Sequence, residues 1–551
     1  MKRPNGLLRA GMFAVAAAAV ALVAGAAARP AGADDPLPRA ASQRHVNAYE
    51  ALLQAGEGSG GEATVKNPTN PICSTSGGGG TNVNTDCEGV APHNETTIAV
   101  NPTNRLNLIG GANDYQLTVS SGGSINETVF SRAHVSFDGG KTWSTVALGD
   151  NGYVATGDPG VAFDAAGNAY YSTLGFGFGQ GSPTARNPDI LVAASHDGGR
   201  TWTRVRVANG TGSFGSVGIL HDKPYIAAWG SGNAIVTWSR FNDLKGGAYG
   251  GSPIFSSVTH DGGATWSTPH EISGSAPFCI GFGGGTACNQ DEFSVPTVAA
   301  DGSIYIAFVS LANTTNFRDQ YLVVKVDPQT GARVAGPFKV ADLVDGITDT
   351  PFNAFGEPTL QDSQFRTFAF GNIAADPTNA AHLAVVWTDT RNSRLPAPSD
   401  PYEAKTNSDV IAAQSFDRGR TWSAATALKI SNDQFQAFGN YGADGLLRIG
   451  FFDRQYDKAN HQYGYSLATE TRTGSLRFST RQLTTVLSDP TQGDRWFSGL
   501  TVNSAFPHPT SFLGDYSGTA PGAALWTDLR NEVCFGVRCG HGEDALYASA
   551  P

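Results

Sequence analysis

The sequence predicts a large all-β protein in which one antiparallel unit is repeated around a ring. The 551 residues include 68 glycines and 10% aromatic residues, and long stretches with helical periodicity are scarce. A pattern of two apolar strands joined by a tight turn recurs roughly every 60 to 75 residues, which is typical of a repeat architecture. A second, shorter pattern, an eight-residue turn, returns four times. Together these observations favour one large repeat domain of four-stranded antiparallel units.

The eight-residue turn has the form Ser/Thr-x-Asp-x-Gly-x-Thr-Trp, and its copies span residues 136–143, 195–202, 259–266 and 415–422. The Asp can accept hydrogen bonds from backbone N–H groups of its own turn, and the Gly can adopt a positive φ. The Trp ring can pack under the turn. We therefore interpret the shared Asp and Trp residues as structural: Asp138, Trp143, Asp197, Trp202, Asp261, Trp266, Asp417 and Trp422.

These four turns resemble the Asp-box, also called the bacterial neuraminidase repeat, of the sialidase superfamily. The resemblance extends over residues 95–551 and implies a secreted β-propeller of the bacterial type. Sialidases have six blades, whereas the repeats in this sequence favour seven, with six as the alternative. Asp-boxes also occur in plant-wall glucanases, sorting receptors and non-catalytic propellers, so the turn indicates an architecture and not a reaction.

Seven first strands can be recognised from their apolar residues. They begin near Thr96, Pro159, Pro224, Val295, Phe370, Phe438 and Leu513. The Asp-box turns fall between the third and fourth strands of units one, two, three and five. The last unit ends on its third strand, so we expect the residues before Glu95 to supply its fourth strand. Such a closure would leave no free sheet edge in the ring.

The first residues predict a secretory leader. Lys2, Arg3 and Arg9 precede an Ala- and Val-rich run, and Ala31-Gly32-Ala33 forms a small-x-small cleavage site. We therefore expect residues 1–33 to be a signal peptide, residues 34–92 a flexible Gly-rich segment with one disulfide clip, and residues 93–551 the propeller. For an exported chain, three disulfides between near neighbours are the simplest arrangement of the six cysteines: Cys73 with Cys87, Cys279 with Cys288, and Cys534 with Cys539.

The charge of the chain limits its partners. The formal net charge is −11, and removal of residues 1–33 takes away four basic and no acidic residues, which leaves a charge near −15. An acidic exported protein favours neither nucleic acid nor insertion into a membrane. We expect a monomer that binds a glycan or glycoconjugate. No zinc or cofactor motif is present, and no twelve-residue calcium loop, although the Asp- and Asn-rich turns leave room for a structural calcium.

The candidate site lies on the face that carries the long connections between strands two and three and between units. Arginines stand at the ends of four second strands on this face: Arg240, Arg391, Arg454 and Arg530. The starts of the first strands contribute Glu95, Asp158, Asp222 and Arg366. Two tyrosines, Tyr441 and Tyr516, belong to first strands near the central channel.

Two interpretations of this set compete. A repeated Asp-x-Arg can be a scaffold pair that bridges neighbouring blades. Alternatively, Arg391, Arg454 and Arg530 converge on the carboxylate of a substrate, because a guanidinium binds a carboxylate through two parallel hydrogen bonds. In that case Asp158 or Asp222 is the acid/base and Tyr441 or Tyr516 the nucleophile of a sialidase-like hydrolase that acts on extracellular glycans.

Two other functions remain open at this stage. The first is a non-catalytic propeller that binds glycan or protein through its long-loop face. The second is a glycosidase for neutral polysaccharide, which would show paired carboxylates instead of an arginine cluster.

Overall fold

The chain folds into a ring of seven antiparallel sheets, which confirms the prediction of a seven-bladed all-β propeller. The computed structural model describes residues 64–65, 82–86, 92–119, 125–149, 153, 155–176, 187–212, 218–244, 248–346, 349–353, 356–393, 400–491, 512–535 and 538–550. Within these residues the elements are strands and turns, without a helix. No described segment therefore forms a helix long and apolar enough to cross a membrane.

The first four blades follow one another along the chain. Blade 1 consists of β3 (His93–Val100), β4 (Leu108–Val119), β5 (Ile125–Ser136) and β6 (Ser144–Val146). Blade 2 consists of β7 (Ala155–Phe163), β8 (Ala169–Phe176), β9 (Asp189–Ser195) and β10 (Thr203–Ala208). Blade 3 consists of β11 (Gly218–Trp229), β12 (Asn233–Leu244), β14 (Ile254–Thr259) and β15 (His270–Glu271), with β13 (Ala248–Tyr249) added to β12. Blade 4 consists of β16 (Asp291–Val298), β17 (Ile304–Ser310), β18 (Gln320–Val326) and β19 (Arg333–Asp342).

The last three blades complete the ring. Blade 5 consists of β20 (Gly371–Ala375), β21 (Leu383–Asp389), β22 (Asp409–Ser415) and β23 (Thr426–Ala427). Blade 6 consists of β24 (Gln434–Tyr441), β25 (Leu447–Asp453), β26 (Gly464–Glu470) and β27 (Phe478–Gln482). Blade 7 consists of β28 (Gly518–Ala520), β29 (Gly522–Phe535), β30 (Arg538–Ala550) and the early strand β2 (Val83–Asn84), and β1 (Thr64–Val65) pairs with β29.

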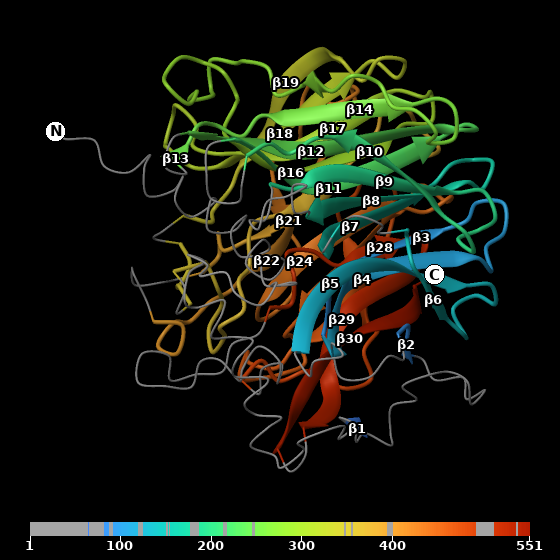
Figure 1. Cartoon of the computed structure of the whole chain (residues 1–551). Helices are drawn as coiled ribbons and strands as arrows, with labels where there is room; N and C mark the ends of the chain where they lie inside the picture. The colour runs from blue at the N-terminus through green and yellow to red at the C-terminus, as the bar shows by residue number, and fades with distance from the viewer. Residues whose placement is uncertain are drawn as a thin grey trace.

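The ring is closed by a strand from the beginning of the chain, as the sequence predicts. Val83 pairs with Tyr547 and Asn84 with Leu546, so β2 is the outer strand of blade 7. The next residue extends the contact, since the Thr85 N–H donates to the Ala545 carbonyl at 3.0 Å. In Figure 1 the red strands of blade 7 consequently lie beside the blue strands of blade 1. The first and last parts of the propeller thus hold each other in place.

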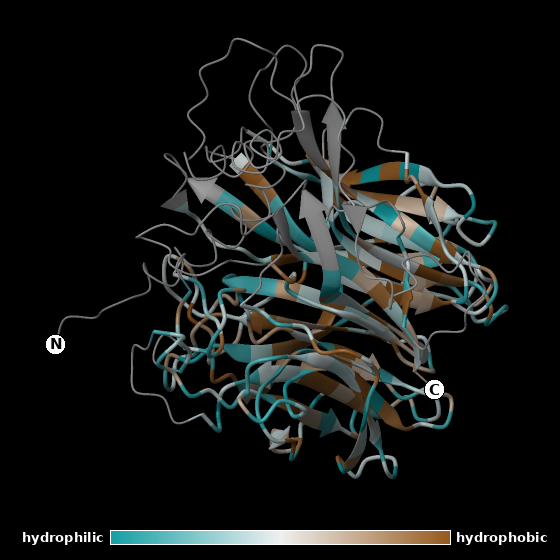
Figure 2. Ribbon diagram, turned by 90° about the horizontal axis from the view of Figure 1, so that it is seen from below, coloured by the Kyte–Doolittle hydropathy of each residue, from teal (hydrophilic) through white to brown (hydrophobic). Residues whose placement is uncertain are grey.

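The cores lie between neighbouring blades. Second strands contribute the largest fully buried side chains, among them Trp238, Trp387 and Trp526. Figure 2 shows the apolar stretches along the strands and many polar residues in the connecting turns. Because both faces of each blade are covered by neighbours, strands such as β17 and β22 are buried along their whole length.

The four Ser/Thr-x-Asp-x-Gly-x-Thr-Trp turns share the Asp geometry that their residues predict, and three of them also share the Trp geometry. In the first of them, the Asp138 carboxylate accepts hydrogen bonds from the Lys141 and Thr142 N–H groups, both at 2.9 Å. The Trp143 indole donates to the Gly140 carbonyl at 3.0 Å, where Gly140 has φ 86°. The copies at 195–202 and 415–422 repeat both features. The copy at 259–266 keeps the Asp261 bonds, but its Trp266 indole N–H is buried without a partner.

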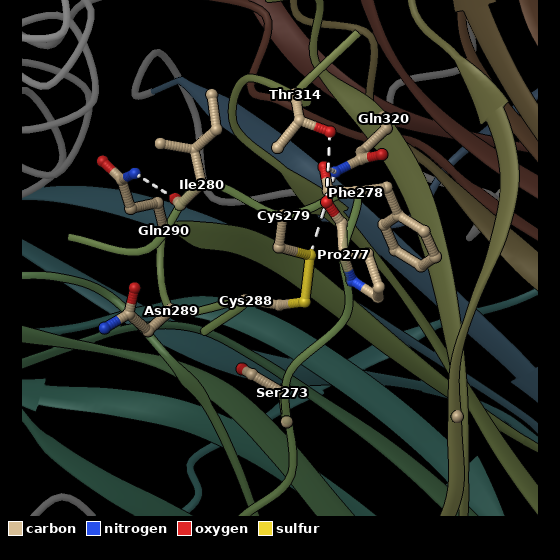
Figure 3. The surroundings of a disulfide bond; sticks show 12 residues. Ser273, Pro277, Phe278, Cys279, Ile280, Cys288, Asn289, Gln290, Thr314 and Gln320 are labelled. Carbon is tan, nitrogen blue, oxygen red and sulfur yellow. Dashed lines mark hydrogen bonds between the residues drawn. A yellow bond between two sulfur atoms is a disulfide. The ribbon is translucent and has the colours of Figure 1, made fainter. Parts of the chain in front are cut away.

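One of the three expected disulfides is described. Cys279 and Cys288 are joined with their Cα atoms 5.2 Å apart, and the bond closes a glycine-rich loop between blades 3 and 4. Figure 3 shows the surrounding contacts, in which Gln320 Nε2 donates to the Phe278 carbonyl at 3.3 Å. Cys534 lies opposite Cys539 in the β29–β30 ladder. Cys73 and Cys87 lie outside the described residues, as do the predicted leader and most of the Gly-rich segment.

Candidate active site

Strand bulges bring a set of charged residues together at one end of the ring axis. The first strands of blades 1, 2, 3, 4 and 6 all shift register near their beginning. At each shift a non-glycine residue adopts a positive φ: Glu95, Asp158, Lys223, Phe293 and Gln436. Such conformations cost on the order of 1–3 kcal/mol each and persist only where the surrounding structure imposes them. Their recurrence at one level of the ring makes this end of the axis the candidate site.

We call the charged residues at this level the axial cluster. It comprises Glu95, Asp158, Asp222, Lys223, Glu292, Glu357, Arg366 and Asp515, and each of these side chains belongs to a residue that is at most 9% exposed. Six carboxyl groups therefore face two cations. The cluster contains residues of blades 1, 2, 3 and 4 and of the segments that precede β20 and β28.

Lys223 is the centre of the axial cluster. Its ammonium lies 2.7 Å from Glu95 Oε1, 2.7 Å from Asp515 Oδ2 and 3.3 Å from Asp158 Oδ2. Three carboxyl groups from three other blades thus share one cation. Burial alone would lower the pKa of Lys223, but these carboxylates raise it well above its usual value.

Arg366 is the second cation of the axial cluster. Its Nε and Nη2 atoms bind both oxygens of Asp515, at 2.8 and 2.7 Å, and its Nη1 lies 3.3 Å from Glu357 Oε1. Burial alone would raise the pKa of Asp515, but Arg366 and Lys223 lower it below the usual range. Asp515 is therefore an ionised group held by two cations.

The remaining carboxyl groups have too few cations to stay fully ionised. Burial raises the pKa of Asp158 to about 6, that of Asp222 to about 7 and that of Glu292 to about 8. Burial and the neighbouring Asp158 also raise the pKa of Glu95. Neither Asp158 oxygen accepts a hydrogen bond from the described residues, although the Lys223 ammonium lies 3.3 Å from Oδ2. The axial cluster thus holds protons near neutral pH.

Tyr516 lies beside the axial cluster, as expected from the sequence. Its hydroxyl donates to the Pro159 carbonyl at 2.9 Å, and its ring lies 5.7 Å from the Lys223 ammonium. The ring also packs against Tyr225 and Phe293, with centroids 6.1 and 5.6 Å away. Burial raises the pKa of Tyr516 well above its usual value, so the phenol stays neutral. This environment suits a packing role better than that of a nucleophile.

Tyr441 lies at the other end of its strand and is not part of this arrangement. β24 begins near the axial cluster, where Gln436 Nε2 donates to the Gly514 carbonyl, and Tyr441 is its last residue. There its hydroxyl meets His382 Nε2 at 3.1 Å, and His382 Nδ1 lies 2.9 Å from Asp376 Oδ2. The structure thus separates Tyr441 from Asp158, Asp222 and Tyr516, because a strand runs between them.

The arginines expected to converge on a ligand carboxylate are each held by a local partner. Arg391 binds both oxygens of Asp389, at 2.8 and 2.6 Å. Arg530 binds Asp528 in the same way, with both distances 2.7 Å. Arg454 is fully buried and lies 3.2 Å from Asp433. This geometry corresponds to the scaffold interpretation, in which each of these arginines pairs with an Asp of its own blade.

Arg240 has a different environment. No described carboxylate pairs with it, and its guanidinium lies 4.8 Å from the centre of the Phe255 ring on the same blade. Burial lowers its pKa. Arg240 therefore packs along blade 3 and does not complete an arginine triad.

A second buried group of charged residues lies where the ring closes. We call Asp86, His93, Asp114, Arg132, His134 and Asp544 the closure cluster. His93 Nε2 lies 2.6 Å from Asp86 Oδ2, and Arg132 Nε lies 3.1 Å from Asp114 Oδ2. Burial alone would lower the pKa of His93, but Asp86 raises it to about 10. Asp86, His93 and Asp114 place one ligand-type atom each within 4.8 Å of one another, and Arg132 lies 3.1 Å from Asp114 as a cation beside them.

Comparisons with known proteins add only general similarities. No family model matches the chain, and no curated protein sequence matches it. Among solved structures, the chain is similar to a protein of unknown function from Dyadobacter fermentans, with 9% identity, 85% of this chain and 98% of the other covered, and a TM-score of 0.38. A Hadza microbial sialidase shows 13% identity, 78% and 77% coverage and a TM-score of 0.37, and an α-L-arabinanase of Penicillium chrysogenum shows 12%, 85% and 97%, and 0.37. At these values no residue role can be transferred.

Sequence reasoning identified part of the axial cluster and missed its centre. Glu95, Asp158, Asp222 and Arg366 are recognisable as charged residues at the starts of first strands, but Lys223, Glu292 and Asp515 were not singled out. The available signal was an acidic residue at the start of units one, two, three, four and seven. The positive φ at each bulge orients these residues toward one another. Because non-glycine residues rarely adopt a positive φ, the sequence does not indicate where these bulges occur.

Proposed function

We propose that this protein is a secreted glycoside hydrolase whose active site is the axial cluster. The observation that carries the proposal is the meeting of Asp158 and Asp222, with Glu95 and Glu292, at one end of the ring axis. Burial places the pKa of Asp158 at about 6 and that of Asp222 at about 7. Glycosidic cleavage uses one protonated and one ionised carboxyl group, and groups with pKa values near neutrality serve both purposes. The predicted leader supports an extracellular place of action.

The two aspartates receive different roles. Asp158 has the lower pKa and lies 3.3 Å from the Lys223 ammonium, which favours its ionised form. It is therefore the base or nucleophile. Asp222 and Glu95 hold protons at neutral pH and supply the acid. Tyr516 forms an apolar wall next to the cluster and keeps its own proton.

The geometry favours a neutral glycan over a sialic acid. Both cations of the axial cluster are bound to carboxylates of the protein, and Arg391, Arg454 and Arg530 are paired with aspartates. An anionic sugar would therefore meet a surplus of carboxyl groups. The Phe/Tyr-Arg-Ile-Pro motif that accompanies the first arginine of sialidases is also absent from the sequence.

A non-catalytic propeller is the second candidate. The observation that favours it is that Lys223 and Arg366 bind carboxyl groups of different blades. Such ion pairs can serve only to hold the blades together. In that case the long-loop face would bind glycan or protein without hydrolysis, and the axial cluster would contribute to the stability of the fold alone.

The test is hydrolysis of a panel of 4-nitrophenyl α- and β-glycosides of neutral pentoses and hexoses, beside a fluorogenic α-sialoside. We expect turnover of at least one neutral glycoside by the wild-type protein. Asp158→Asn and Asp222→Asn should each lower kcat/KM by about 100-fold or more, because each removes a group that transfers a proton or attacks the substrate.

Asp409→Asn is the matched control. Asp409 is buried, has a pKa raised to about 6 by burial, and lies on β22 with Asn392 as its hydrogen-bond partner at 2.7 Å. This variant should keep wild-type activity. Turnover of the sialoside alone would restore the sialidase interpretation, and no turnover of any substrate would favour the binding propeller.

A further inference from the structure

Lys223 occupies an unfavourable backbone conformation that the fold maintains. It has φ 49° and is followed by Pro224, and a residue before proline avoids helical conformations because of the proline ring. Asp158 has the same arrangement, with φ 56° before Pro159. The Lys223 N–H is fixed by Asp222 Oδ1 at 3.0 Å. Strain of this kind persists only where the surrounding structure imposes it, and here it fixes the backbone from which the Lys223 side chain reaches the axial carboxyl groups.

The contacts of the ammonium are unequal. Glu95 and Asp515 each lie 2.7 Å away, and Asp158 lies 3.3 Å away. Asp515 has a second cation, since Arg366 binds both of its oxygens. Among the ion pairs of the described residues, those of Glu95 and Asp158 have the Lys223 ammonium as their cation. Asp515 therefore has two counter-ions, Lys223 and Arg366, whereas Glu95 and Asp158 share the single positive charge of Lys223.

The groups that face Lys223 come from every blade packed against it. Glu95 belongs to β3, Asp158 to β7 and Glu292 to β16, while Asp222 precedes Lys223 on β11. Asp515 and Tyr516 precede β28, and Arg366, behind Asp515, precedes β20. Apart from Arg366, all of these groups are acidic or, like Tyr516, neutral.

We infer that Lys223 is a positioning residue that sorts the axial carboxyl groups into one permanent anion, Asp515, and a set that shares protons, Glu95, Asp158 and Asp222. The catalytic part of this inference rests on the proposed hydrolase function. The sorting itself is a property of the folded protein and can be measured without a substrate. It explains how a cluster of six carboxyl groups can contain an acid and a base at the same pH.

The directions of the pKa shifts agree with this arrangement. Burial raises the pKa of Glu95, whereas the two cations lower the pKa of Asp515. Removal of the ammonium would leave burial unopposed at Glu95 and Asp158. Their pKa values should then rise further by about 1 to 3 units, the usual effect of losing an opposite charge at this distance.

The first test compares the melting temperatures of wild type and Lys223→Met at pH 5 and pH 8. At pH 5 the carboxyl groups can take up protons and compensate for the missing cation, but at pH 8 they must ionise in the unfolded state and not in the folded one. We expect the loss of melting temperature in Lys223→Met to be roughly twofold larger at pH 8 than at pH 5. Lys223→Arg, which keeps the charge, should show a loss that does not change with pH.

Lys339→Met is the control, because Lys339 makes an ion pair with Asp342 at 2.5 Å on the outer strand of blade 4. Its effect should be small and equal at both pH values. An equal loss at both pH values in Lys223→Met would overturn the inference, because it would show that the side chain only fills space.

The second test is the pH dependence of kcat/KM for the glycoside that the wild-type protein hydrolyses. In Lys223→Met the acidic limb should move to higher pH by about 1 to 3 units, because Asp158 must lose its proton to act, and in Lys223→Arg it should stay. If the wild type hydrolyses no glycoside, the proposed function fails, while the melting experiment still decides the inference. If hydrolysis is found and neither the limb nor the melting difference changes, the inference alone fails.

Discussion

The axial cluster and the closure cluster both include residues of blade 1, and both are buried, but their charges are matched differently. In the closure cluster His93 and Arg132 lie next to Asp86 and Asp114, with closest distances of 2.6 and 3.1 Å. Burial alone would raise the pKa of Asp86, but His93 lowers it well below the usual range, and Asp86 in turn raises that of His93 to about 10. In the axial cluster six carboxyl groups face two cations, and burial raises the pKa of several acids to between about 6 and 8.

The difference indicates what each cluster does. In the closure cluster the Asp86–His93 ion pair connects β3 to the segment that follows β2, and the Asp114–Arg132 ion pair connects β4 to β5, whereas burial raises the pKa of the third carboxyl group, Asp544, to about 6. A surplus of buried carboxyl groups is unfavourable for the folded state, and the proposed hydrolase function would account for its presence. Burial of charged groups alone therefore does not distinguish a structural cluster from a candidate active site. The ratio of carboxyl groups to cations in the cluster is the more useful criterion.

The largest expected effect concerns the closure cluster. Asp86→Ala should lower the free energy of unfolding by about 3 to 5 kcal/mol, because it leaves the buried His93 without its closest counter-ion. Denaturant unfolding monitored by tryptophan fluorescence measures this change. A loss below about 1 kcal/mol would show that the pair is worth no more than an exposed one and that the ring closes without it.

The pH dependence of stability sharpens the comparison. Asp158, Asp222 and Glu292 have higher pKa values in the folded protein than in the unfolded chain, so the folded state binds more protons between about pH 4 and pH 8. The free energy of unfolding should therefore fall with rising pH across this window, by several kcal/mol between pH 5 and pH 8. In Asp158→Asn the fall should be smaller. A stability that rises over the same window would contradict the surplus of buried carboxyl groups.

The smallest effects are expected at the paired arginines of the rim. Arg530→Ala should cost about 2 to 3 kcal/mol, because Asp528 is buried but keeps the Trp526 indole as a donor at 3.0 Å. Arg391→Ala should cost about 1 to 2 kcal/mol, since its side chain is 22% exposed and solvent screens the pair. Both variants should hydrolyse the glycoside at wild-type rates. A loss of activity without a loss of stability would return these arginines to a role in substrate binding.

The repeat in the sequence was sufficient to predict much of the fold. The apolar first strands and the Ser/Thr-x-Asp-x-Gly-x-Thr-Trp turns predict seven blades, and the missing last strand predicts the closure by β2. These features are local patterns that each unit repeats. Trp387 and Asp389 recur as Trp526 and Asp528, and in both blades the indole and the following arginine bind the Asp, as expected of a repeated scaffold pair.

The candidate site was predictable only in part because it depends on contacts between distant units. Asp158 and Asp222 were recognised from their position before first strands. The ion pairs of Lys223 with Glu95 and Asp515 join residues that are far apart in the chain, and nothing local indicates which of the acidic residues share a cation. Tyr441 and Tyr516 occupy similar places in the sequence, yet only Tyr516 lies beside the axial cluster, because β28 begins after it and β24 ends at Tyr441.

The most direct test of the central claim is the change in melting temperature at pH 8 caused by Asp158→Asn and by Asp86→Asn. Each variant replaces a buried carboxyl group by an amide of the same shape. If the axial cluster carries surplus charge for chemistry and the closure cluster is a balanced structural pair, Asp158→Asn should keep or raise the melting temperature while Asp86→Asn lowers it. Equal losses in the two variants would contradict the account, because both clusters would then serve the stability of the fold in the same way.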